Sequence, residues 1–124
     1  MKKLCITWSL GFITLLAQAQ TKFIRAYAMH KAEYIKEDWE FDEGVPSNTL
    51  IEVGDKKVIV HNQEIETYQL YNIDQELKNL TTWHAADAKG NPCVFYFGMT
   101  KQGSLYVMFE DGNKGVLYYG DSEE

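Results

Sequence analysis

Glycine-ended turns in the C-terminal half constrain the fold more than any other feature. The tripeptides AKG at 88–90 and KQG at 101–103 have the length of a three-residue hairpin loop. The last residue of such a loop needs a positive φ, which glycine adopts without a Cβ clash. A third turn lies within DGNK at 111–114. The flanking runs are rich in Phe, Tyr and Val, which favour strands. The pattern predicts an antiparallel meander from residue 80 to residue 119.

These turns also predict which residues stand opposite each other. The loop at 101–103 sets Phe97 opposite Val107, and the loop at 88–90 sets Trp83 opposite Phe95. The third turn sets Val107 opposite Tyr118. All three registers place apolar residues on one predicted core face: Trp83, Ala85, Cys93, Phe95, Phe97, Met99, Leu105, Val107, Phe109, Val116 and Tyr118. A slip of one residue would invert a strand, so the agreement supports these registers.

The opposite face of the same strands is also apolar, which is unusual for a sheet that faces water. Either the N-terminal half covers this face, or the face binds a partner. Tyr and Met suit recognition because they combine contact area with a polar tip or a flexible stem. The candidate binding face consists of His84, Tyr96, Tyr106, Met108, Leu117 and Tyr119.

The N-terminal half is less determined by its sequence. Strands are expected near 22–30, 49–53, 57–61 and 65–73. The segment 31–43 fits either a short helix over 32–38 or a strand, and 74–77 fits one helical turn. In the hairpin around Gly54, Val58 pairs with Val53 or with Ile51, and the first register is preferred because it gathers the apolar side chains. The predicted fold is one antiparallel all-β domain of about seven or eight strands, an incomplete barrel or a two-layer sandwich.

Residues 1–19 have the features of a secretory signal peptide. Lys2 and Lys3 precede an apolar stretch from Leu4 to Leu16, and AQA at 17–19 offers the small residues of a cleavage site. We expect cleavage after Ala19, one domain at 20–124, and a secreted or periplasmic protein of bacterial type. Removing both lysines would take the formal net charge from −6 to −8. That charge disfavours nucleic-acid binding, and no membrane anchor is expected after cleavage.

No constellation of residues points to catalysis or to a cofactor. Only Cys93 would remain after cleavage, in an apolar strand where a buried, unreactive thiol is expected. The histidines lack the spacing of a metal site. The acidic segment 37–43 lacks the pattern of a calcium loop. The chain is therefore expected to be non-enzymatic, with no metal and no cofactor.

Three functions are compatible with these features. The leading one is a module that binds a protein or another macromolecule through an aromatic strand face or an open strand edge. The second is a carrier that holds an apolar ligand in a barrel cavity of ~300 Å³ or more. The third is a periplasmic inhibitor of a hydrolase, whose acidic aromatic segment 36–43 would insert Trp39 or Phe41 into a cleft.

Several short stretches carry a resemblance to other proteins. They are AQAQ at 17–20, KFIRAYAM at 22–29, ETYQLY at 66–71, DAKGNPC at 87–93 and LYVMFEDGNKGVLYY at 105–119. In these stretches the chain resembles a group of small, secreted, uncharacterised proteins of gut-type Gram-negative bacteria. The resemblance implies secretion and an all-β fold, and it implies no activity and no site residue.

Overall fold

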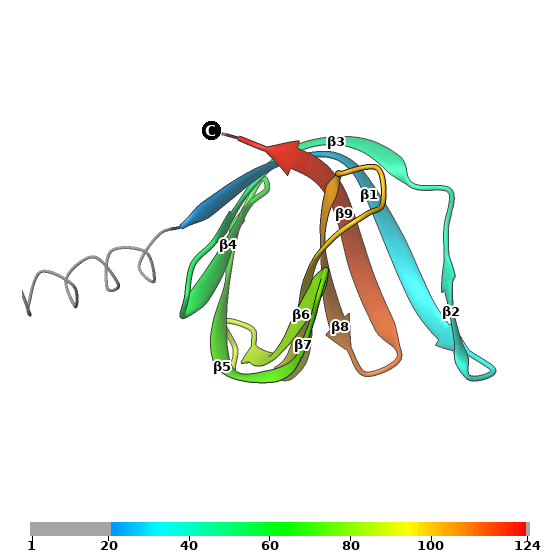
Figure 1. Ribbon diagram of the computed structural model, residues 1–124. Helices are drawn as coiled ribbons and strands as arrows, with labels where there is room; N and C mark the ends of the chain where they lie inside the picture. The colour runs from blue at the N-terminus through cyan, green and yellow to red at the C-terminus, as the bar shows by residue number, and fades with distance from the viewer. Residues whose placement is uncertain (1–20, 124) are drawn as a thin grey trace, which may run out of the picture.

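The computed structural model describes residues 21–123, so the expected signal peptide at 1–19 lies outside the described residues. Strands occupy most of this range, and all of them pair in antiparallel fashion (Figure 1). Their bounds are β1 (Lys22–Ile35), β2 (Asp38–Phe41), β3 (Val45–Val53), β4 (Lys57–His61), β5 (Ile65–Leu77), β6 (Leu80–Ala86), β7 (Pro92–Met99), β8 (Leu105–Asp111) and β9 (Lys114–Ser122).

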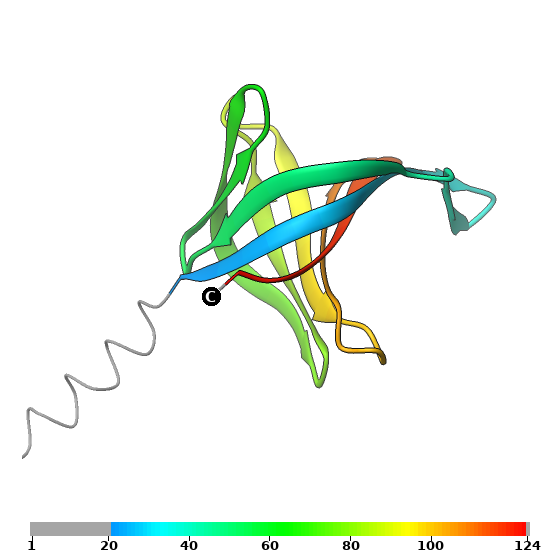
Figure 2. The same cartoon turned by 90° about the horizontal axis from the view of Figure 1, so that it is seen from above.

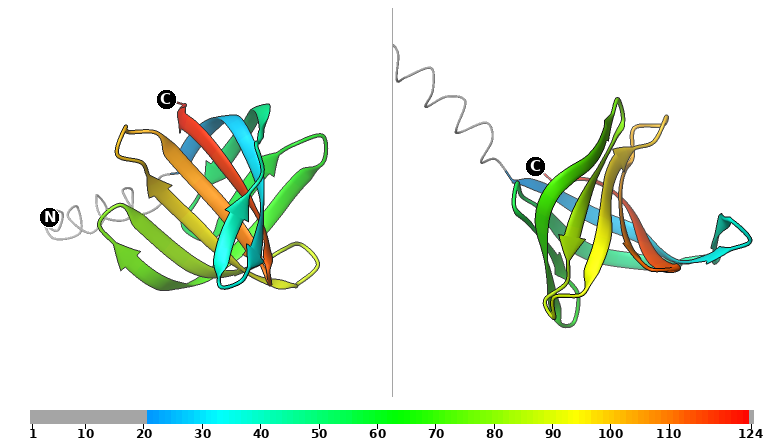
Figure 3. Two further views of the ribbon diagram at one scale, coloured as in Figure 1. Left: turned by 90° about the vertical axis from the view of Figure 1, so that its right-hand side faces the viewer. Right: turned by 90° about the horizontal axis from the view of Figure 1, so that it is seen from below.

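The strands close into a barrel. From β3 to β9 each strand pairs with the next, and β1 pairs with both β3 and β9, which joins the two ends of the sheet. Strand β2 lies outside this ring and pairs only with the last residues of β1, so the β1–β2 hairpin extends past the barrel (Figures 2 and 3). The prediction of one antiparallel all-β meander that curls into a barrel is confirmed, and the pairing of β1 with β9 closes that barrel.

The predicted registers are confirmed. Phe97 pairs with Val107, Trp83 pairs with Phe95, and Val107 also pairs with Tyr118 on its other side. The N-terminal hairpin adopts the preferred register, in which Val53 pairs with Val58. The two registers that involve β7 follow from their turns: Gly90 and Gly103 have φ values of 88° and 92°, as the predicted hairpin loops require.

The predicted core face points into the barrel, where side chains fill the space. The largest fully buried side chains come from β1, β3, β4, β7 and β8 and are Ile24, Ile51, Val58, Val60, Phe95 and Val107. Phe95 lies between Trp83 and Phe109, with ring centroids 5.4 and 5.2 Å away. Met99 departs from the prediction: it stands at the end of β7 and is 48% exposed, because the strand leaves the core there.

Two segments for which a helix was considered are strands. Strand β1 continues to Ile35, and β2 returns beside it so that Tyr34 faces Trp39. Residues 74–77 belong to β5 and pair with β6. Both helical alternatives were wrong because hydrogen bonds to a neighbouring strand outweigh the weak local preference for a helix.

Closure of the barrel depends on a close approach between β1 and β9. The register of β1 shifts between Ala26 and Ala28, which marks a bulge. A Cβ on Gly120 would lie 2.4 Å from the carbonyl oxygen of Arg25, a distance that no side chain tolerates. The two strands therefore meet at this bulge only because residue 120 is glycine.

We predict that Gly103→Ala lowers the free energy of unfolding by about 1–2 kcal/mol, because a residue with a Cβ is strained at the positive φ of this position. A Cβ at this position would meet nothing within 4 Å, so the cost is conformational and not steric. Thermal or urea unfolding measures it. Gly103→Asn should lose less, since asparagine tolerates this conformation. Equal or increased stability of the alanine variant would contradict the assigned turn.

We predict the opposite effect for Glu37→Gly. Lys36 and Glu37 form the turn between β1 and β2 with φ values of 52° and 68°, which non-glycine residues adopt at a cost. Glycine should remove that cost. Because glycine also raises the conformational entropy of the unfolded chain, the net gain in the free energy of unfolding should be about 0.5–1 kcal/mol. Glu40→Gly, the same change inside β2, is the matched control and should destabilise the chain in the same unfolding assay.

Candidate functional site

The β1–β2 hairpin partly covers the outer face of β8 and β9. Trp39 from β2 packs against a small outer cluster formed by Ala32, Met108 and Leu117, all of which are buried. Gly115 makes room for this packing, because a Cβ there would lie 2.8 Å from Cε of Met108. The predicted binding face and the predicted inhibitory segment therefore meet, and Met108 and Leu117 lie beneath the surface instead of on it.

Aromatic rings remain accessible around this outer cluster. We call them the aromatic surface, which consists of His30, Tyr34, Trp39, Tyr96, Tyr106 and Tyr119. The Tyr119 ring lies 5.6 Å from the His30 ring and 6.1 Å from the Tyr106 ring, measured between centroids. Tyr34 and Trp39 meet edge to face at 5.4 Å. Tyr96, Tyr106 and Tyr119 are half-buried, and Tyr34 is 44% exposed.

Two of these tyrosines have fixed ring positions. Tyr106 lies directly over Gly98, where a Cβ would come within 2.5 Å of its ring and hydroxyl. The Tyr96 hydroxyl donates a hydrogen bond to Glu110. Burial, together with that carboxylate, raises the pKa of Tyr96 far above its usual value, and burial also raises the pKa of Tyr106. Both hydroxyls stay protonated at neutral pH, but Tyr96 already donates its single proton to Glu110, so Tyr106 is the one that can donate to another molecule.

The other two predicted site residues lie at the margins of this region. His84 is exposed on β6, opposite Val94, and forms an ion pair with Asp74 of β5, with 3.2 Å between Nε2 and Oδ1; it is not among the residues packed on the outer cluster. Phe41 is 47% exposed at the end of β2, opposite Ala32. Trp39 is only half-buried, so both rings of the predicted inhibitory segment retain accessible surface.

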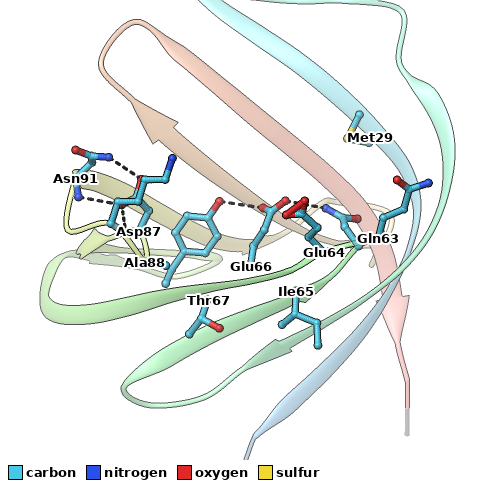
Figure 4. A pocket seen from close by; sticks show the side chains of 12 residues that line it. Met29, Gln63, Glu64, Ile65, Glu66, Thr67, Asp87, Ala88 and Asn91 are labelled. Atoms are coloured by element: carbon cyan, nitrogen blue, oxygen red, sulfur yellow. Dashed lines mark hydrogen bonds between the residues drawn. The ribbon is translucent and has the colours of Figure 1, made fainter.

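Sequence reasoning missed a second concave region, at one mouth of the barrel. This mouth pocket has a volume of about 800 Å³ and lies between β1, the turns that join β4 to β5 and β6 to β7, and the start of β5 (Figure 4). Asn62 is central to its lining: its side-chain NH₂ donates to Glu66 at 3.4 Å and to the Tyr118 hydroxyl at 3.2 Å. Thr49 donates to the Asn62 oxygen at 3.1 Å.

Neither a metal site nor a membrane-spanning helix is found over residues 21–123. Within that range no three His, Cys, Asp or Glu side chains gather as metal ligands would. No helix in the same range is long and apolar enough to cross a membrane.

The chain was compared with protein-family models, with curated proteins and with solved structures, and none of them matches it. The roles of its residues therefore rest on geometry and chemistry.

The Cys93 thiol lies half-buried on the inner side of the barrel, opposite Ala85. Burial raises its pKa from 9.0 to about 11, and the charges of Asp87 and Asp111 add to this effect. The thiolate is the reactive form, and it needs a pH near 11 to dominate in the folded protein.

We predict slow labelling of Cys93 in the folded protein. At pH 8 its thiolate population should be ~100-fold smaller than that of an unperturbed thiol, and the labelling rate should fall accordingly relative to the chain unfolded in urea. A disulfide reagent that releases a coloured thiol measures both rates. Because the folded-state pKa is the higher one, the folded rate should still be rising at pH 10. The sequence predicted a buried thiol, whereas the structure leaves it half-buried; equal rates in the folded and unfolded protein would contradict the raised pKa.

Proposed function

We propose that this chain is a non-enzymatic, exported binding module that recognises a protein partner through the aromatic surface. One observation carries the proposal: accessible aromatic rings gather on the outside of a barrel whose interior is already filled. Phe95 of β7 and Val107 of β8 point inward with no exposed surface, while Tyr106 of β8 and its neighbour Tyr119 of β9 point outward. The inner face holds the fold together, so the outer rings are free to contact another molecule.

The composition of the aromatic surface supports a protein partner. Interfaces are enriched in Tyr, Trp and Met, and tyrosine offers a large rigid contact area at a low entropic cost. The Tyr106 hydroxyl stays protonated as a donor, and its ring is held in place over Gly98, while Tyr96 is fixed by its hydrogen bond to Glu110. Rings that are already fixed lose little freedom on binding, which favours affinity.

A hydrolase inhibitor is the second candidate, and the exposure of Phe41 favours it. The β1–β2 hairpin extends past the barrel (Figure 2). It exposes Phe41 on one face of β2 and the acidic residues Asp38 and Glu40 on the other. The carrier hypothesis has less support. It needs an enclosed apolar cavity, whereas side chains fill the barrel interior and the mouth pocket opens to solvent.

Site-specific photo-crosslinking tests the proposal. A benzophenone amino acid at position 34 should form a defined protein adduct in the envelope fraction of the bacterium that encodes the chain. The same amino acid at position 71 is the control, since Tyr71 is a 66% exposed tyrosine on β5, away from the aromatic surface. Tyr106→Ser combined with Tyr119→Ser should weaken binding of the crosslinked partner at least tenfold, as expected for anchor residues that each contribute more than ~1 kcal/mol.

Three results would count against the proposal. They are the absence of an adduct from position 34, equal adducts from positions 34 and 71, and unchanged affinity of the double variant. Circular dichroism must first show that the double variant is folded. Replacement of Phe41 by serine separates the two candidates: it should leave the partner bound by the aromatic surface, whereas an inhibitor of the second kind would lose its effect.

A further inference from the structure

The mouth pocket is lined by charged and amide side chains that have no part in the proposed function. Its volume of about 800 Å³ is within the range of small-molecule sites, and the mouths of β-barrels are one of their usual positions. It lies at the end of the barrel, whereas the aromatic surface lies on the outer wall. Its lining combines apolar side chains, amides and charged groups, as Figure 4 shows.

The charges of the lining are unequal. The lining contains one cationic side chain, Lys89, and three acidic ones, Glu64, Glu66 and Asp87. Asp87 is engaged within its own turn, where its side chain accepts hydrogen bonds from the backbone NH groups of Lys89 and Asn91 and from the Asn91 amide. The ion pairs found over residues 21–123 include neither Glu64 nor Glu66. Two carboxylates therefore remain to attract a cation from solution.

Glu66 is held ready for such a ligand. Tyr68 donates to its Oε1 at 3.2 Å, and Asn62 donates to its Oε2 at 3.4 Å. A carboxylate has about four acceptor positions, so these two bonds orient the group and leave positions open for ligand donors. The carboxylate needs no rearrangement to bind, which keeps the entropic cost of binding low.

The pocket also has an apolar side. The Tyr68 ring stacks on Phe109, with centroids 4.2 Å apart, and lines the pocket with Met29, whereas the Ile65 side chain points to the other face of β5 (Figure 4). Aromatic rings attract ammonium groups, and the Met29 side chain suits methylene groups. An anionic ligand would be repelled by the carboxylates, and an uncharged ligand would leave them without a counter-charge.

We propose that the barrel mouth binds a small aliphatic diamine, with one ammonium on Glu66 and the second on Glu64. The methylene chain of the ligand lies along Tyr68 and Met29. This site is independent of the aromatic surface, and its occupancy does not depend on the protein partner proposed above.

Titration with 1,5-diaminopentane, followed by amide NMR spectra of the purified protein, tests the proposal. At pH 7 both amino groups carry a charge, since amines of this kind titrate near ~10. The amides of Glu66, Thr67 and Asn91 should shift in a saturable way. Added salt should weaken the binding. The uncharged 1,5-pentanediol, which has the same length, should cause no such shifts.

The variants separate charge from shape. Glu66→Gln keeps the shape and removes the charge, and should weaken diamine binding at least tenfold. Glu64→Gln should weaken diamine binding similarly. This second variant removes no hydrogen bond found over residues 21–123, so the proposal can still be tested if Glu66→Gln unfolds. Glu76→Gln, on β5 outside the pocket, should bind like the original protein.

Several results would overturn the proposal. These are the lack of saturable shifts up to about 10 mM diamine, equal binding of the diol, and unchanged affinity of either pocket variant. Nα-acetyl-lysinamide, which carries a single ammonium on a peptide unit, should bind more weakly than the diamine. Tighter binding of this compound would assign the pocket to a lysine side chain and would also overturn the proposal.

Discussion

The pairing of β1 with β9 is the constraint on which the rest of the structure depends. Without it, the meander from β3 to β9 would be an open sheet with two free edges. Such edges invite pairing with other chains, and closure removes them. The pairing brings Ala26 beside Gly120, residues that lie far apart in the sequence, and the bulge in β1 with the bare glycine in β9 lets the strands meet.

Closure also gives the two apolar faces of β7, β8 and β9 separate roles. Inward residues such as Phe95 and Val107 fill the barrel and hold it together. Outward residues of β8 and β9 would be left to water, but Trp39 covers the two most apolar of them, Met108 and Leu117. The remaining rings form the aromatic surface, and the open end of the barrel forms the mouth pocket. Two separate accessible regions, one on the barrel wall and one at its end, thus result from the closure of one sheet.

The sequence predicted the C-terminal half well because its turns have specific chemistry. Gly90 and Gly103 set the registers, and strand alternation then assigned each side chain to a face. The β1–β2 hairpin was missed because its turn has Lys36 and Glu37 where a glycine-containing pair would have been a signal. The mouth pocket was missed because its residues converge from separate turns, and no local pattern links Asn62 to Tyr118.

The sequence by itself determined the strand-rich fold class, the hairpin registers and the inward or outward direction of most side chains. These depend on turn conformation and on alternation, which act over a few residues. Only the tertiary structure decided that the sheet closes, that Trp39 shields the outer cluster, and that Glu66 is oriented at a pocket. Those features depend on contacts between segments distant in the chain, and such contacts are chosen by the packing of the whole molecule.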